Sequence, residues 1–211
     1  MSRKKLFFFD LETTGLGLQG ERIVPVQIAG ILVDPNVPGW PELARFGPFF
    51  LKIPKGAHCE PYAMAMHEEK NRTRDFFNIQ GYDPKDVYER LREFLKPYGK
   101  CVPAGHQAAG FDVPLLIQES HLAGVPLESP RGAEWGLDYH VYDTAGLAYA
   151  MLYYASAHPI ERVSLKPLCE HLGIPVREDL QHDAMYDIEL TVKCAREMHK
   201  RLTNALHRAA V

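Results

Sequence analysis

The feature that most constrains the fold is a run of large apolar residues at positions 6–9, followed at once by Asp10 and Glu12. Such a run is typical of a strand buried on both faces in the middle of a sheet. Side chains alternate along a strand, so Asp10 and Glu12 should point the same way while Leu11 points into the core. Adjacent acids repel each other unless a cation lies between them, and ligand sets made of oxygen suit magnesium or manganese. The pattern predicts a central strand that ends in a metal site.

The alternative is a surface strand whose two acids are simply solvated. We disfavour it, because acids at the mouth of a phenylalanine-rich central strand are partly desolvated and need a compensating charge. Asp-x-Glu alone is a weak signal, so the interpretation depends on the partners that the rest of the chain supplies.

Length and composition favour one well-packed domain. A chain of 211 residues, 46% apolar and 24% charged, is ordinary for a soluble globular protein of that size. The basic start, residues 3–5, briefly imitates a secretion signal, but Asp10 ends the apolar stretch after four residues, which is too short. No apolar run approaches the length of a membrane span. We therefore expect a cytoplasmic protein with no membrane contact.

Cysteine spacing and charge argue against two other classes of protein. The four cysteines contain no Cys-x-x-Cys pair, which disfavours a zinc ribbon or a compact disulfide framework and favours free thiols. The formal charge of −3 is not that of a protein that coats long duplexes. Basic clusters at residues 70–74 and 193–201 would suit a protein that grips a few phosphates, although such clusters are usually solvated helix faces.

The order of expected elements predicts an α/β fold. Residues 22–33 and 46–53 read as strands that continue the first one in an antiparallel meander. Two later strands are expected at residues 100–104 and 139–142, and residues 124–137 are expected to form a long turn-rich loop. Helices are expected at residues 61–67, 84–96, 112–122, 144–154, 165–172 and about 183–206. The chain should form a mixed five-stranded sheet, three antiparallel strands plus two parallel ones, flanked by helices.

Helical periodicity also predicts which side chains the later helices bury. Leu115, Leu116 and Leu122 should pack inward from one helix. The last helix should bury a stripe of five residues, namely Ile188, Val192, Ala195, Leu202 and Leu206.

Three further residues lie where such a metal site would form. Asp112 lies where a loop turns into a helix, and Asp187 lies one turn inside the last helix. On a single helix, the five-residue spacing would turn His182 about 140° away from Asp187, so we expect His182 in the loop before that helix. Each has an ordinary alternative when taken singly. Asp112 could cap its helix, Asp187 could complement the helix dipole, and His182 could be structural.

Taken together, residues 9–16, 105–112 and 182–187 resemble the motifs of the DEDDh family of 3′–5′ exonucleases, which includes polymerase proofreading subunits, ribonuclease T and oligoribonuclease. The resemblance covers nearly the whole chain. It implies a ribonuclease H-like fold, with residues 1–211 as a single exonuclease domain.

Two positions are informative about the match. Gln107 stands where the family usually has asparagine, with one residue more before Phe111. Asp183 occupies the position at which the sister subclass carries tyrosine, so the histidine subclass is the better match.

The resemblance implies two divalent ions, Mg²⁺ or Mn²⁺, about 4 Å apart. Asp10 would bridge both ions, Glu12 and Asp187 would hold the ion that bears the nucleophilic water, and Asp112 would help to fix the second. His182, neutral near pH 7, would take the proton of the water.

The resemblance also implies contacts with the 3′ end of the substrate. Thr13 would offer its backbone or hydroxyl to the terminal 3′ group. Leu16 and Met66 would wedge against the last bases, with Ala63 and His67 nearby.

The predicted function is a metal-dependent 3′–5′ exonuclease that releases nucleoside 5′-monophosphates from single-stranded DNA or RNA ends. Alternatives with the same chemistry are an RNA-trimming enzyme and a short-oligonucleotide hydrolase. An alternative of another class is a non-catalytic module that binds nucleic acid or a polymerase, and the complete set of acids argues against it. Preference between DNA and RNA stays open, as do homodimerisation and polymerase association.

Overall fold

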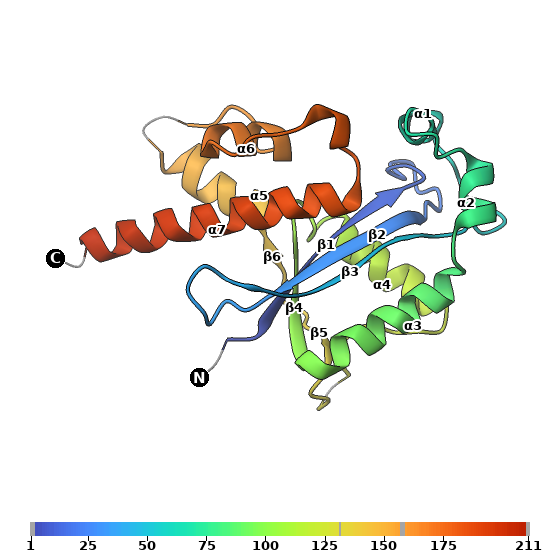
Figure 1. Cartoon of the computed structure of the whole chain (residues 1–211), viewed down its shortest axis with the longest axis horizontal. Helices are drawn as coiled ribbons and strands as arrows, with labels where there is room; N and C mark the ends of the chain where they lie inside the picture. The colour runs from blue at the N-terminus through green and yellow to red at the C-terminus, as the bar shows by residue number, and fades with distance from the viewer. Residues whose placement is uncertain (1–2, 131, 157–158, 210–211) are drawn as a thin grey trace.

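A mixed sheet of six strands organises the computed structural model, which describes residues 3–130, 132–156 and 159–209 (Figure 1). The strands are β1 (Lys5–Thr13), β2 (Pro25–Val33), β3 (Glu42–Phe50), β4 (Lys100–Gly105), β5 (Gly136–Leu137) and β6 (Tyr142–Asp143). Their order is β3-β2-β1-β4-β5, with β6 also paired to β4. β1, β2 and β3 pair antiparallel, whereas β4 runs parallel to β1, β5 and β6. The predicted meander followed by parallel strands is confirmed.

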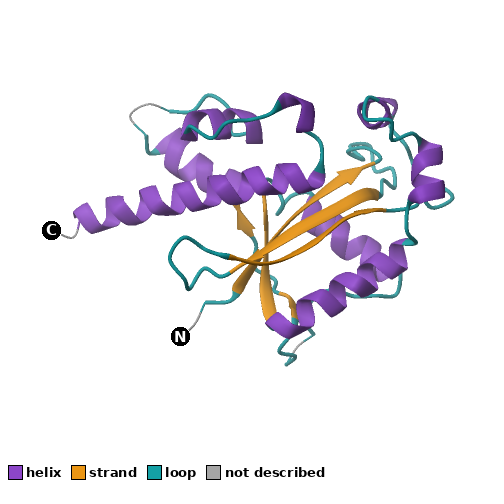
Figure 2. Ribbon diagram, viewed as in Figure 1, coloured by secondary structure: helices purple, strands orange, loops and turns teal. Residues whose placement is uncertain are grey.

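Helices cover both faces of this sheet (Figure 2). They are α1 (Pro61–Glu68), α2 (Arg74–Gln80), α3 (Pro84–Leu95), α4 (Asp112–Leu122), α5 (Thr144–Ala148), α6 (Leu165–Leu172) and α7 (Ala184–Ala209). Short 3₁₀ helices, η1 (Lys96–Tyr98) and η3 (Glu178–Leu180), and a π-helix, η2 (Tyr149–Tyr154), complete the set. Among the helices of the described ranges, none has both the length and the apolar character that a bilayer span requires.

β1 is buried on both faces, as its sequence predicts. Phe7 and Phe9 lie in the core formed with α3 and α4, whereas Phe8 lies in a second core that includes residues of α7. All three rings are at most 1% exposed. Because β1 has a neighbour on each side and helices above and below, its end is a rigid base for the two acids that follow.

The expected strand at residues 139–142 is wrong, and its region instead supplies β5 and β6, so the sheet has six strands rather than five. The break has a local cause. The Asp138 carboxylate accepts a hydrogen bond from the backbone N–H of His140, at 3.1 Å, and also pairs with Lys4. This side-chain turn carries the backbone away from β4 until pairing resumes at Tyr142.

The boundaries of two strands also differ from those expected. β2 begins at Pro25 rather than at residue 22, and β3 covers Glu42–Phe50 rather than residues 46–53. Helix α2 was not predicted, although Thr73 caps it by accepting a hydrogen bond from the N–H of Phe76.

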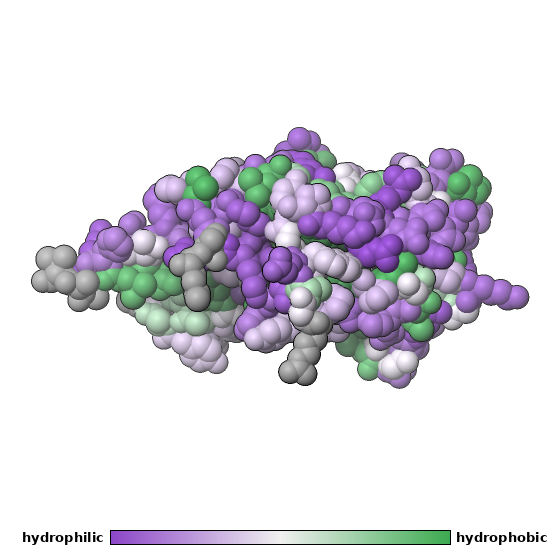
Figure 3. Space-filling view, turned by 90° about the horizontal axis from the view of Figure 1, so that it is seen from below, coloured by the Kyte–Doolittle hydropathy of each residue, from purple (hydrophilic) through white to green (hydrophobic). Residues whose placement is uncertain are grey.

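The predicted burial of three leucines is wrong. Leu122 is 62% exposed, in the last turn of α4, and Leu202 and Leu206 are 36% and 61% exposed on α7. The C-terminal half of α7 extends past the sheet, so the apolar side chains of this half have no sheet to pack against (Figure 1). Apolar side chains accordingly gather beside the C-terminal end in the space-filling view (Figure 3).

Candidate active site

The two acids of β1 lie side by side on one face of the strand, as predicted. Asp10 and Glu12 are both partly buried, while Leu11 between them is only 6% exposed and belongs to the core. Pairing with β2 is regular through Glu12, and a register shift follows between Glu12 and Thr13. The sheet therefore fixes both carboxylates before the chain leaves β1.

Asp112 joins this pair from α4. Its side chain is 6% exposed, and its Oδ1 accepts a hydrogen bond of 3.1 Å from the backbone N–H of Leu11. The N-cap residue of α4 is Phe111, so the alternative in which Asp112 merely caps its helix is wrong. The bond instead ties the start of α4 to β1 between the two acids.

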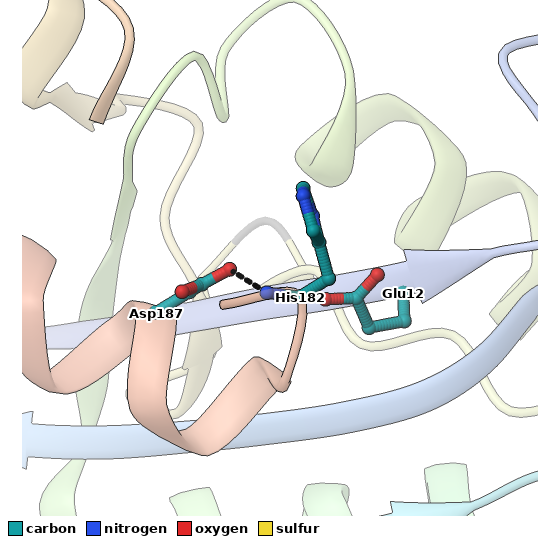
Figure 4. Close-up of side chains that lie close together, drawn as sticks. All are labelled: Glu12, His182 and Asp187. Carbon is teal, nitrogen blue, oxygen red and sulfur yellow. Dashed lines mark hydrogen bonds between the residues drawn. The ribbon is translucent and has the colours of Figure 1, made fainter. Parts of the chain in front are cut away.

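His182 and Asp187 close the site from the other side. Asp187 lies in the first turn of α7, and its Oδ2 accepts a hydrogen bond of 3.0 Å from the backbone N–H of His182 (Figure 4). His182 lies in the loop before α7, as predicted, with a left-handed φ of 58°. One ligand atom each of Glu12, His182 and Asp187 lie within 4.8 Å of one another.

These carboxylates disfavour their own ionisation. Burial, with repulsion from Asp112 and Glu12, raises the pKa of Asp10 well above its usual value. Burial and the charge of Asp187 raise the pKa of Glu12 to about 7. Burial likewise raises the pKa of Asp112 to about 7 and that of Asp187 to about 6. At Glu12 the positive charges of Lys70 and Arg72 offset this effect only in part, and the oxygen donors of the cluster fit Mg²⁺ or Mn²⁺.

The surroundings of His182 favour its neutral form. Partial burial, together with the nearby charge of Lys70, lowers the pKa of its imidazole below the usual value. This shift favours the neutral ring, which is the form that can accept a proton from water.

The residues predicted to contact substrate occupy α1 and the loop after β1. His67 is 3% exposed, and its Nε2 donates to the carbonyl oxygen of Thr13, at 2.9 Å. The hydroxyl of Thr13 donates to the carbonyl oxygen of Gly15, at 2.7 Å. Met66 and Ala63 are partly buried, whereas Leu16 is 58% exposed. Leu16 is therefore not a core residue, and the substrate roles stay predictions.

Glu60 holds the loop that carries Leu16, a role that no sequence pattern predicted. Its Oε1 accepts hydrogen bonds from the backbone N–H groups of Leu16, at 2.9 Å, and Gly17, at 2.8 Å. A Cβ at Gly15 would lie 2.4 Å from Cδ of Glu60, so only glycine fits there without a shift.

Asp143 holds the loop after β4, which has one residue more than the family pattern. Its carboxylate accepts hydrogen bonds from the backbone N–H groups of Gln107, at 3.1 Å, and Ala109, at 2.9 Å. Gln107 has a left-handed φ of 61°. The loop is thereby anchored to the start of α5, and Asp112 keeps its predicted place.

Four polar residues around the loop of residues 181–183 form a network that the sequence analysis did not predict. Gln27 lies opposite Glu12 in the β1–β2 register, and its side chain contacts both Arg72 and Asp183. Lys70 donates to the carbonyl oxygen of Gln181. The sequence had shown Lys70 and Arg72 as part of a basic cluster, but it gave no indication of where they bind.

Comparison with solved structures finds the same fold. Exonuclease I from Methylocaldum szegediense, described as moderately thermophilic, is 21% identical, with a TM-score of 0.72 over 94% of this chain and 41% of that one. The zinc-bound Exonuclease I–single-stranded DNA complex of E. coli is 16% identical, with a TM-score of 0.74 over 95% of this chain and 41% of that one. The chain thus spans about two fifths of the length of these structures.

Comparison with curated proteins found no significant match, but a family model identifies the chain from its sequence. A family model described as RNase_T, exonuclease, matches residues 7–195, a range that contains all four carboxylates and His182. The chain belongs to this exonuclease family, of the DEDDh 3′–5′ type that its motifs predicted.

Proposed function

We propose that the chain is a metal-dependent exonuclease that hydrolyses single-stranded nucleic acid from the 3′ end to nucleoside 5′-monophosphates. The observation that carries the proposal is the convergence of four partly or fully buried carboxylates from β1, α4 and α7, with a histidine in the adjoining loop whose neutral form is favoured by burial. A non-catalytic binder would gain nothing from such mutual repulsion. The matched E. coli structure is a complex with single-stranded DNA, which supports the strandedness proposed here.

Asp10, Glu12, Asp112 and Asp187 would hold two divalent ions, Mg²⁺ or Mn²⁺. When bound, such ions offset the carboxylate charge, activate water and stabilise the charge that develops on the phosphodiester. The chain contributes the remaining steps. His182 accepts the proton of the attacking water at a ring nitrogen, and its backbone bond to Asp187 keeps it beside the carboxylates.

The 3′ terminus would enter between α1 and the loop after β1. His67 fixes α1 to the end of β1 through Thr13, and Glu60 fixes the loop that presents Leu16. We propose that Leu16 and Met66 contact the terminal bases and that the backbone of Thr13 faces the terminal 3′ group, with Ala63 beside them.

The test is digestion of matched 5′-labelled DNA and RNA single strands with Mg²⁺, with Mn²⁺ or with EDTA. We expect stepwise shortening that requires metal and that a 3′-phosphate blocks. A circular single strand should stay intact. Asp10→Asn serves as the inactive control. Rapid internal cutting of the circle, or a wild-type rate for Asp10→Asn, would overturn the proposal, and the ratio of DNA to RNA rates assigns the substrate.

A further inference from the structure

A buried polar network holds the loop of residues 181–183, called here the His182 loop. At its centre is the side chain of Gln27, which is 1% exposed. Its Nε2 donates to Oδ2 of Asp183, at 3.2 Å, and its Oε1 accepts from the backbone N–H of Ala184, at 3.4 Å. Strand β2, which pairs with β1 and places Gln27 opposite Glu12, therefore binds both the end of the His182 loop and the start of α7.

Arg72, in the turn between α1 and α2, completes this network. One guanidinium nitrogen donates to Oε1 of Gln27, at 3.1 Å, and another to Oδ2 of Asp183, at 2.8 Å. The guanidinium also lies over the ring of Phe50, 4.9 Å from its centroid. Lys70 adds a separate bond to the carbonyl oxygen of Gln181. Two cations two residues apart thus bind both sides of His182.

The turn that carries these cations is continuous with α1. The backbone N–H groups of Lys70 and Arg72 both donate to the carbonyl oxygen of His67, at 3.0 and 2.9 Å. His67 in turn binds Thr13 at the end of β1. A chain of direct contacts therefore leads from α1, beside the expected 3′-end pocket, to the His182 loop.

His182 needs such support, because its φ of 58° is unfavourable for a residue with a Cβ. Conformations of this kind persist only where the surrounding structure imposes them. The bond from the His182 N–H to Asp187 supplies one restraint, and the contacts of Lys70, Arg72 and Gln27 supply the others.

We infer that Arg72 and Lys70 are positioning residues for His182, and that their turn couples α1 to the placement of the catalytic base. This inference rests on the proposed function. Without the forked Arg72 contact, the His182 loop would leave its strained conformation, and the imidazole would no longer lie beside the carboxylates. Hydrolysis should slow while substrate and metal still bind.

A competing account is that the two cations act only through charge. Burial and Asp187 raise the pKa of Glu12, whereas Lys70 and Arg72 lower it, so their charge also favours the ionised carboxylate. Arg72→Lys separates the two accounts. It retains the positive charge, but a single ammonium group lacks the planar fork that spans Gln27 and Asp183.

For Arg72→Lys we expect kcat to fall about ten- to a hundredfold, the loss typical of a misplaced catalytic group. KM for a 5′-labelled oligonucleotide and the Mn²⁺ dissociation constant should stay within about twofold, since the substitution leaves the proposed substrate and metal contacts in place. Arg45→Lys is the matched control. Arg45 also makes a forked contact, to Glu42, and reaches Glu189 of α7, but it does not touch the His182 loop. Its kcat should not change.

A double-mutant cycle with His182→Ala tests whether Arg72 acts through His182. In that background, Arg72→Lys should cost less than about twofold, because the group that it positions is gone. Lys70→Met, which keeps the alkyl chain and removes the donor, should behave in the same way and provides a second variant. All rates are measured below each melting transition. Wild-type kcat in both Arg72→Lys and Lys70→Met would overturn the inference. So would an equal loss of kcat from Arg72→Lys in the wild-type and His182→Ala backgrounds. A wild-type protein that digests no strand would instead refute the proposed function.

Discussion

Glu12→Gln should stabilise the metal-free protein while abolishing its activity. Burial and the charge of Asp187 raise the pKa of Glu12 from 4.5 to about 7. At about 1.36 kcal/mol per pH unit, ionised Glu12 destabilises the metal-free fold by about 3 kcal/mol. Glutamine has the same shape and no charge, so it escapes this cost. For a chain of this length, that corresponds to a melting temperature roughly 6–12 °C higher at pH 8.

The sign of the pH dependence follows from the direction of the shift. Below about pH 4.5, Glu12 is protonated in both the folded and the unfolded states, and the two proteins should be equally stable. As pH rises towards 7, the unfolded chain ionises Glu12 first, and the wild-type fold loses stability. Above about 7 the penalty is constant. The advantage of Glu12→Gln should therefore grow between pH 4.5 and 7 and then stay level.

The measurement is thermal unfolding in EDTA at pH 5 and pH 8, with Glu189→Gln as control. Glu189 is a carboxylate of α7 that pairs with Arg45 outside the site, so its amide variant should not be stabilised. Mn²⁺ should raise the wild-type melting temperature and affect Glu12→Gln much less, because the variant lacks one anionic ligand. An equal advantage at both pH values, or a Glu12→Gln protein less stable at pH 8, would refute the reasoning.

Other variants test the remaining assignments. Asp10→Asn should fold normally, by circular dichroism, and lose orders of magnitude in hydrolysis of a 5′-labelled strand, because a carboxylate proposed to bind metal is gone. His182→Ala should lose most turnover and still bind Mn²⁺ and oligonucleotide. Since partial burial lowers the His182 pKa, wild-type activity limited by this base should level off at a lower pH than a free imidazole would give, and full turnover of the mutant from pH 6 to 7 would contradict the role. Leu16→Ala and Met66→Ala should raise KM several-fold, since a contact with a base is worth at most about 1–3 kcal/mol. Unchanged KM would contradict this role, and for the partly buried Met66 a large drop in melting temperature would then indicate a packing residue instead.

Periodic segments of the chain were predictable, and short ones were not. β1 and α3 carry strong local signals, a dense apolar run and an Asp83–Pro84 start in which Asp83 caps the helix. β5 and β6 have two residues each, too few for any alternation to show, and they exist because β4 offers an edge for pairing. Tertiary pairing rather than local preference decided that region.

The convergence of the candidate site residues was predictable because their positions follow from local geometry. A period of two places Asp10 beside Glu12, and helix starts after loops place Asp112 and Asp187 at the same edge of the sheet. The residues that hold them came from elsewhere. Arg72 reaches Asp183 only because the turn after α1 folds over the β1–β2 pair, and nothing near Arg72 in the sequence encodes that contact.

One residue of the network nevertheless had a signal that could have been used. β2 is buried along its whole length, and Gln27 is the only residue in it with a polar side chain. An amide in such a strand must find hydrogen-bond partners, since burying it unpaired costs about 1–3 kcal/mol. Apolar residues cannot supply them, so the partners had to be polar groups brought in from other segments. With β2 antiparallel to β1, residue 27 faces the acids of β1, where Asp183 and Arg72 meet it. A lone amide in a fully buried strand therefore predicts a polar network at that position, and here the network lies beside the carboxylates of the candidate site.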